Sequence, residues 1–74
     1  MGKIANAMLE ARFRVGMTQE EVAKATGIAR MTISRVETCL YIPWAKNLLK
    51  LADFYGLDRN EILDLARMDK LERK

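Results

Sequence analysis

The side chains with the most binding chemistry in this sequence form a polar group between residues 30 and 35. They lie one and four positions apart, so a helix would carry them on one side. The group consists of Arg30, Met31, Ser34 and Arg35. Ile33 and Val36 fall on the opposite side, where the same helix would bury them in a core. The polar side must therefore meet something outside its own core, and its guanidinium groups offer charge and hydrogen-bond donors.

Charge is unevenly distributed along the chain, which has 74 residues and a net charge of +3. Residues 1–52 hold eight Lys or Arg and four Glu, a net charge of +4. Residues 53–74 hold five Lys or Arg and six Asp or Glu, a net charge of −1. A basic front section suits a polyanionic partner, but an excess of this size is common on proteins of many kinds. The pattern of residues must therefore decide the function.

Catalysis has little support among the residue types present. The chain has no His, and its single cysteine, Cys39, lacks a His partner that would activate it as a nucleophile. Neither a Gly-rich phosphate loop nor a cluster of metal ligands appears in the sequence. We therefore expect a protein that is not an enzyme and that uses no cofactor or metal. Since neither a signal-like apolar run nor a membrane-length stretch is present, we expect a cytoplasmic location.

Apolar spacing and helix-end signals predict five helices and an all-α fold. The expected helices are residues 3 to about 14, 19–26, 30–38, a fourth that starts at Pro43, and a fifth after Asp58. Thr18 and Glu21 form a capping box that opens the second helix, and Gly27 ends it. The domain is expected to span residues 1–68, with residues 69–74 as a charged C-terminal tail.

The second and third expected helices, joined by a turn that contains Gly27, match the arrangement that helix-turn-helix proteins use to read DNA. Residues 16–23 (Gly-Met-Thr-Gln-Glu-Glu-Val-Ala) and 27–37 (Gly-Ile-Ala-Arg-Met-Thr-Ile-Ser-Arg-Val-Glu) resemble the Cro and phage-repressor (Xre-type) helix-turn-helix family. Pro43, residues 48–52 and Gly56 resemble its fourth helix in content and spacing. The resemblance covers residues 4–63. It implies a compact five-helix lambda-repressor-like fold and a sequence-specific DNA-binding transcriptional regulator that occupies an operator.

The resemblance also assigns roles within the helix-turn-helix element, residues 19–38. It implies contacts to DNA bases from the outer face of the third helix, by Arg30, Met31 and Arg35, and we add Ser34, which lies between them. An Arg there would bind guanine O6 and N7 together, whereas a Met offers only apolar contact, for instance to a thymine methyl group. It implies a contact to a DNA phosphate, which positions the domain without reading sequence, from Gln19. We expect further phosphate contacts from Thr18, Thr38 and Lys46.

A structural ion pair between Arg12 and Glu37, joining the first and third helices, is a further implication of the resemblance. The sequence also departs from the family pattern at three places. Ala29 replaces the usual Ser or Thr cap before the third helix, which typically costs about 1 kcal/mol. Cys39 replaces a helix-ending Gly, where we interpret it as a tolerated small residue. Residues 40–42 (Leu-Tyr-Ile) form an apolar loop where relatives often carry Lys or Arg.

Two groups of apolar residues suggest further contacts. The first helix carries a second apolar stripe, Ala5, Leu9 and Phe13, which would pack under the fifth helix or the tail, or contact another domain or subunit. The fifth helix would leave apolar surface at Leu63, Met68 and Leu71. We expect this surface to serve a two-fold homodimer on a palindromic site.

Two alternatives to this use of the surface remain open at this point. Residues 51–57 and 63–67 are similar to N-terminal domains of certain actinobacterial regulators, so the surface near the end of the fifth helix would instead dock a C-terminal effector domain. The alternative function is a protein-interaction module, such as an antitoxin, that holds a partner with residues 40–44 and the stripe at Leu9 and Phe13. Salt dependence separates the two functions, because binding to phosphates weakens steeply with salt and apolar binding hardly changes.

Overall fold

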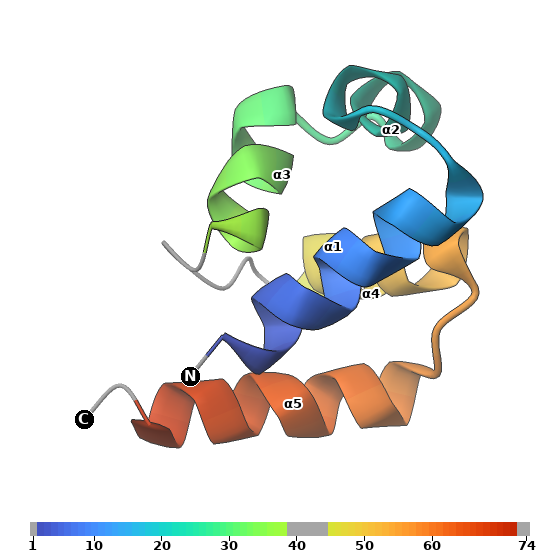
Figure 1. Cartoon of the computed structure of the whole chain (residues 1–74). Coiled ribbons are helices and arrows are strands. Elements are labelled where there is room, and N and C mark those ends of the chain that lie inside the picture. The colour runs from blue at the N-terminus through green and yellow to red at the C-terminus, as the bar shows by residue number, and fades with distance from the viewer. Residues whose placement is uncertain (1, 39–44, 73–74) are drawn as a thin grey trace.

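The computed structural model describes residues 2–38 and 45–72, with side chains to residue 70, and this part of the chain forms five α-helices (Figure 1). They are α1 (Lys3–Val15), α2 (Gln19–Thr26), α3 (Arg30–Glu37), α4 (Ala45–Tyr55) and α5 (Arg59–Glu72). The all-α prediction is therefore confirmed. The predicted start of the fourth helix at Pro43, and residues 39–42, lie outside the described residues. None of the described helices is long and apolar enough to cross a membrane.

The ends of α2 follow from side chains that the sequence places next to it. Thr18 Oγ1 accepts a hydrogen bond from Glu21 N at 3.1 Å, and Glu21 Oε1 accepts one from Thr18 N at 2.8 Å, so the predicted capping box is present. Gly27 ends α2 with a φ of 76°, a left-handed conformation that favours glycine. Beside it, buried Thr26 donates to Val22 O at 2.8 Å and accepts from Ile28 N at 3.2 Å. These bonds hold the turn between α2 and α3.

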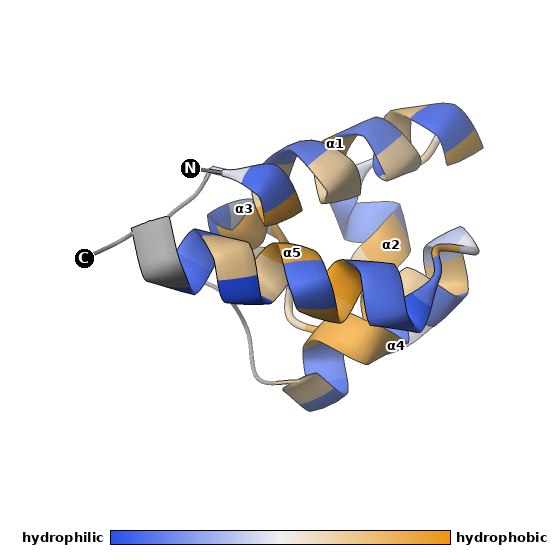
Figure 2. Cartoon of the chain, turned by 90° about the horizontal axis from the view of Figure 1, so that it is seen from below, coloured by the Kyte–Doolittle hydropathy of each residue, from blue (hydrophilic) through white to orange (hydrophobic). Residues whose placement is uncertain are grey.

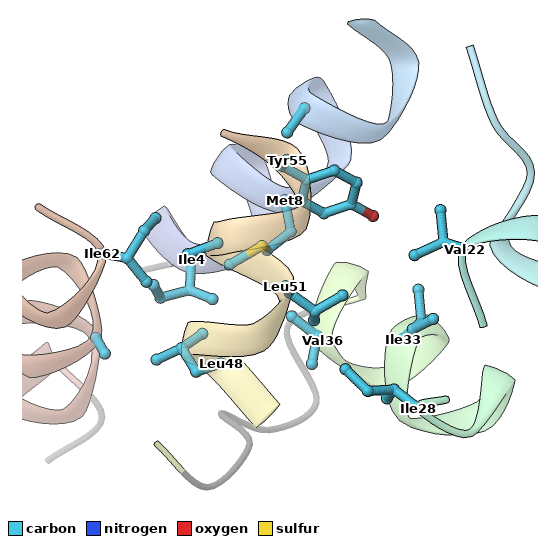
Figure 3. Close-up of a cluster of buried hydrophobic side chains, with 13 residues drawn as sticks. Ile4, Met8, Val22, Ile28, Ile33, Val36, Leu48, Leu51, Tyr55 and Ile62 are labelled. Atoms are coloured by element: carbon cyan, nitrogen blue, oxygen red, sulfur yellow. The ribbon is translucent and has the colours of Figure 1, made fainter. Parts of the chain in front are cut away.

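The core lies where α1 packs against α3, α4 and α5 (Figure 3). Ile4 and Met8 on α1 pack with residues of α4 and α5, among them Leu48 and Ile62. Toward the other end, the buried residues come from α2, the turn and α3: Val22, Ile28, Ile33 and Val36. Ile33 and Val36 are each 1% exposed, so the predicted inner face of the third helix is confirmed. This packing is what turns the polar side of α3 outward.

The C-terminal end of α5 is hydrogen-bonded to the start of α1. Helix α5 continues to Glu72, and Asp69 is 3% exposed rather than part of a charged tail. Its two carboxylate oxygens accept hydrogen bonds from Lys3 N at 3.0 Å and Ile4 N at 2.8 Å. Gly2 precedes α1 and has no side chain to cap it, so Asp69 supplies the cap from the far end of the chain.

Replacing Asp69 with alanine is expected to lower the free energy of unfolding by about 1–3 kcal/mol, because two first-turn N–H groups would lose their acceptor. Urea titration followed by circular dichroism measures this change. The control is Asp64→Ala on the same helix, whose carboxylate is exposed and pairs with exposed Arg67 at 3.4 Å. We expect the control to unfold like the wild type. Equal unfolding midpoints for the two variants would contradict a capping role for Asp69.

Candidate nucleic-acid interface

Helices α2 and α3 lie at one end of the molecule and α5 at the other, with α1 and α4 between them (Figure 1). On α3, Arg30 and Arg35 are exposed, and Met31 is 63% exposed. Ser34 is half-buried on the same helix. Three of the four residues predicted to contact bases are therefore on the solvent side of α3, and the fourth lies at its margin.

The start of α3 has no side-chain cap. Ala29 stands at the cap position, and its carbonyl oxygen accepts hydrogen bonds from Thr32 N at 3.0 Å and Ile33 N at 3.2 Å. A cap side chain would satisfy N–H groups of the first turn that have no partner within the helix. Here that end of α3 presents the backbone of Arg30 and Met31 beside their exposed side chains.

At the start of α2, the capping box accounts for two of the N–H groups that cannot bond within the helix, those of Thr18 and Glu21. By helix geometry, the N–H groups of Gln19 and Glu20 remain available to an acceptor outside the chain. The Thr18 hydroxyl accepts from Glu21 N and keeps its own proton to donate. This end of α2 therefore offers hydrogen-bond donors together with the positive end of the helix dipole.

A hydrogen-bonded network joins α1, α2 and α3 behind this surface. Arg12 on α1 binds Glu37 on α3 through two hydrogen bonds, Nε to Oε2 at 2.8 Å and Nη2 to Oε1 at 3.0 Å. The Arg12 side chain is 12% exposed and that of Glu37 is 3% exposed. Arg12 Nη1 also donates to Met17 O at 2.9 Å. The ion pair expected from the resemblance is thus present, and it fastens the turn before α2 as well.

Gln19 belongs to the same network, which sequence reasoning missed. Its Nε2 donates to Glu37 Oε1 at 2.9 Å, and the residue is half-buried. The expectation from the resemblance concerned only a DNA phosphate as partner. Hydrogen bonding to Glu37 raises the pKa of the Arg12 guanidinium above its ordinary value, so Arg12 stays positively charged.

Buried Tyr55 on α4 lies close enough to Arg12 and Glu37 for their charges to affect the pKa of its phenol. Burial raises the pKa of its phenol to about 12, the negative charge of Glu37 adds to the rise, and the positive charge of Arg12 opposes it. Within the described part of the chain, its hydroxyl has no hydrogen-bond partner. Tyr55 therefore stays neutral near pH 7 and contributes mainly its ring to the packing beneath the network.

The remaining predicted phosphate contacts differ in how their polar groups are placed. The Thr38 hydroxyl donates to Ser34 O at 3.0 Å and to Arg35 O at 3.2 Å, so its proton is used within the end of α3. Lys46 is exposed near the start of the described part of α4. The structure therefore leaves Lys46 accessible to an anion, whereas Thr38 would have to turn its hydroxyl to donate to one.

The predicted apolar surfaces are only partly exposed. On α1, Ala5 is buried, Leu9 is half-buried and Phe13 is 66% exposed, so the stripe is covered at one end and open at the other. The Arg12 guanidinium lies 5.0 Å from the centre of the Phe13 ring, a cation–π contact. On α5, Leu63 is half-buried and Met68 is 46% exposed (Figure 2 shows α5 from its outer side). The side chain of Leu71, and residues 40–44, lie outside the described part.

Metal binding has no support in the described residues, where no three or more His, Cys, Asp or Glu side chains are grouped to hold an ion. The exposed polar groups described above, on α2, α3 and α4, are hydrogen-bond donors and cations. Such a surface is suited to a partner rich in acceptors and negative charge.

The sequence is similar to known proteins of the helix-turn-helix type. A family model described as "Helix-turn-helix" matches residues 8–62. An uncharacterized HTH-type transcriptional regulator from Methanocaldococcus jannaschii is 39% identical over 46 residues, which cover 62% of this chain and 70% of that protein. No solved structure matches the chain. The residues that the family model matches, 8–62, contain α2, the turn and α3, which form the exposed surface described above.

Proposed function

This chain belongs to the helix-turn-helix family of the Cro and phage-repressor type and is a DNA-binding transcriptional regulator, and we propose that it acts by inserting α3 into the major groove of an operator. The family works by binding DNA and not by catalysis. Because a regulator of this kind must reach DNA, we propose that it is located in the cytoplasm.

The division of α3 into two faces carries the proposal. Its inner face is buried in the core, and its outer face presents Arg30, Met31 and Arg35 to solvent. An α-helix with its side chains is about 10–12 Å across, and the major groove is about 12 Å wide, so α3 fits within the groove with its outer face toward the base edges. We assign guanine contacts to the two arginines, an apolar contact to Met31, and a secondary contact to Ser34.

We assign the phosphate contacts to groups at both ends of the recognition surface. At the start of α2, Thr18 and Gln19 offer hydroxyl, amide and backbone donors. Beyond α3, Lys46 offers a charged amine, and Thr38 joins it only by turning its hydroxyl away from the carbonyls of α3. These contacts would position the domain equally well on any sequence.

Selection of bound sites from random DNA tests the proposal, followed by affinity measurements on the selected site over a range of salt concentrations. We expect one enriched sequence, bound with an affinity that falls steeply as salt rises, because each neutralised phosphate releases counterions. A protein-interaction module would give no enriched sequence and nearly salt-independent binding to its partner. That result would contradict the proposed function.

We further propose that the functional unit is a two-fold dimer on a palindromic site, with half-sites about 34–36 Å apart. One short recognition helix reads few base pairs, whereas two helices at a fixed spacing roughly double the specific contacts. Apolar surface for pairing is available on α5 at half-buried Leu63 and exposed Met68, and we include Leu71 from the sequence pattern.

Sedimentation of the protein, free and bound to the selected site, tests the dimer. We expect two protein chains on each site and a symmetric selected sequence. A monomer in free solution that still pairs on DNA would agree with the proposal and would leave the α5 surface to a C-terminal effector domain. One chain on a high-affinity site without symmetry would contradict it.

A further inference from the structure

We propose that Glu37 is a positioning residue for DNA binding, which does not touch DNA itself but sets the orientation of the Gln19 amide that meets a phosphate. This inference rests on the proposed function, because it needs Gln19 to lie against the DNA backbone. It gives the buried ion pair of the domain a second task besides stability.

The orientation follows from what each group can accept or donate. An ionised carboxylate only accepts hydrogen bonds, so the amide nitrogen of Gln19, and not its oxygen, must face Glu37 Oε1, which lies 2.9 Å away. Glu37 cannot follow a moving Gln19, because Arg12 holds both of its oxygens at 2.8 and 3.0 Å. The Gln19 amide is therefore fixed against a rigid acceptor.

This fixed orientation suits a phosphate. The amide nitrogen has two N–H groups that diverge by about 120°, and only one of them is needed for Glu37. Gln19 is half-buried, so the other part of its amide remains in reach of a partner outside the chain. A phosphate only accepts hydrogen bonds, so an unconstrained amide that presented its oxygen would repel it. Glu37 removes this unfavourable orientation before DNA arrives, which lowers the ordering cost of binding.

The position of Glu37 Oε1 supports a shared role. This single oxygen accepts from both Arg12 Nη2 and Gln19 Nε2, so the pair that joins α1 to α3 also reaches the first turn of α2. An ion pair that served stability alone would need only the two bonds between Arg12 and Glu37. The third bond ties the phosphate end of α2 to the helix that enters the groove.

A double-mutant cycle on DNA affinity tests the positioning role. The first change is Gln19→Met, which keeps the side-chain length and removes the donor. The second is Arg12→Met with Glu37→Leu, which removes both buried charges together and so leaves neither unpaired. The third protein combines all three substitutions. Each is measured on the selected site and on unrelated DNA, at a temperature where circular dichroism shows it folded.

We expect Gln19→Met to weaken binding to both DNAs about 3- to 10-fold, because a phosphate contact carries no sequence information. We expect Arg12→Met with Glu37→Leu to weaken binding as well, and the triple variant to bind within about twofold of it. Unchanged binding by the ion-pair variant, or a triple variant that shows both losses in full, would overturn the positioning role. Unchanged binding by Gln19→Met would overturn it too. The proposed function fails separately, if the wild type selects no DNA sequence.

If the variant that lacks the ion pair does not fold, nuclear magnetic resonance of the wild type tests the positioning role directly. Gln19 is the only glutamine in the chain, so its side-chain amide signals can be identified directly. We expect one of its two protons to exchange slowly with water before and after DNA is added, and the other to shift on binding. Exposed Asn6 and Asn60 are the reference for an unconstrained amide. Gln19 protons that exchange as fast as theirs would overturn the proposal.

Discussion

Replacing Glu37 with leucine is expected to lower the free energy of unfolding by about 3–5 kcal/mol, the largest loss that we expect from one polar substitution in this domain. The Glu37 side chain is 3% exposed and accepts all three side-chain bonds of the network. Its removal would leave the Arg12 charge buried without a counter-ion and Gln19 without an acceptor. A domain of 74 residues has a total stability of roughly 4–11 kcal/mol, so the variant should be close to unfolding.

Urea titration followed by circular dichroism measures this loss, with two controls. Arg12→Met combined with Glu37→Leu should recover much of the stability, because no unpaired charge is left in the core. Asp53→Ala should change the unfolding midpoint little, although the Asp53–Arg59 contact is short at 2.6 Å, because both side chains are exposed and solvent screens the pair. If Glu37→Leu were as stable as Asp53→Ala, the network would have no structural importance.

The Arg35→Ala variant is expected to bind the selected operator about 5- to 150-fold more weakly, which corresponds to about 1–3 kcal/mol. Arg35 is exposed on α3 and far from the core, so its loss should not affect folding. A guanidinium bonded to guanine O6 and N7 distinguishes that base pair from the other three. We therefore expect the variant to lose preference at one base pair and to keep its affinity for unrelated DNA nearly unchanged. Repeating the site selection with the variant measures both effects.

Arg67→Ala is the matched control for this experiment. Arg67 is also an exposed arginine on a helix, but it lies on α5, at the opposite end of the molecule from α3 (Figure 1). Arg67→Ala changes the net charge by the same amount as Arg35→Ala, so an effect of lost positive charge alone would be equal in the two variants. If the selected sequence is the same for Arg35→Ala and the wild type, Arg35 does not read a base.

Local signals explain why most of the fold was predictable. The capping box at Thr18 and Glu21 and the glycine at position 27 define the ends of α2 through bonds within a few residues of each other. The spacing of Ile33 and Val36 determines which side of α3 is buried. The burial of Asp69 could not be predicted from the sequence, because a run of charged residues at the end of a chain is also typical of a solvated tail.

The hydrogen bond between Gln19 and Glu37 could not be predicted from local sequence signals. The two residues are 18 positions apart and on different helices, so no periodicity relates them. Each has an ordinary role of its own, Gln19 as a first-turn helix residue and Glu37 as the partner of Arg12. Only the packing of α2 against α3 brings the amide to a carboxylate oxygen that already holds an arginine.

The sequence by itself determined the helices, the inner and outer faces of α3 and the family, because these depend on residue spacing over one or two helical turns. Only the tertiary structure decided that Asp69 caps α1 from 66 positions away and that Gln19 donates a hydrogen bond to Glu37. Such bonds join groups that are distant in sequence, and the angles at which helices pack determine whether they meet. A carboxylate in a charged stretch can face solvent, a counter-ion or a helix end, and its neighbours in space select among these.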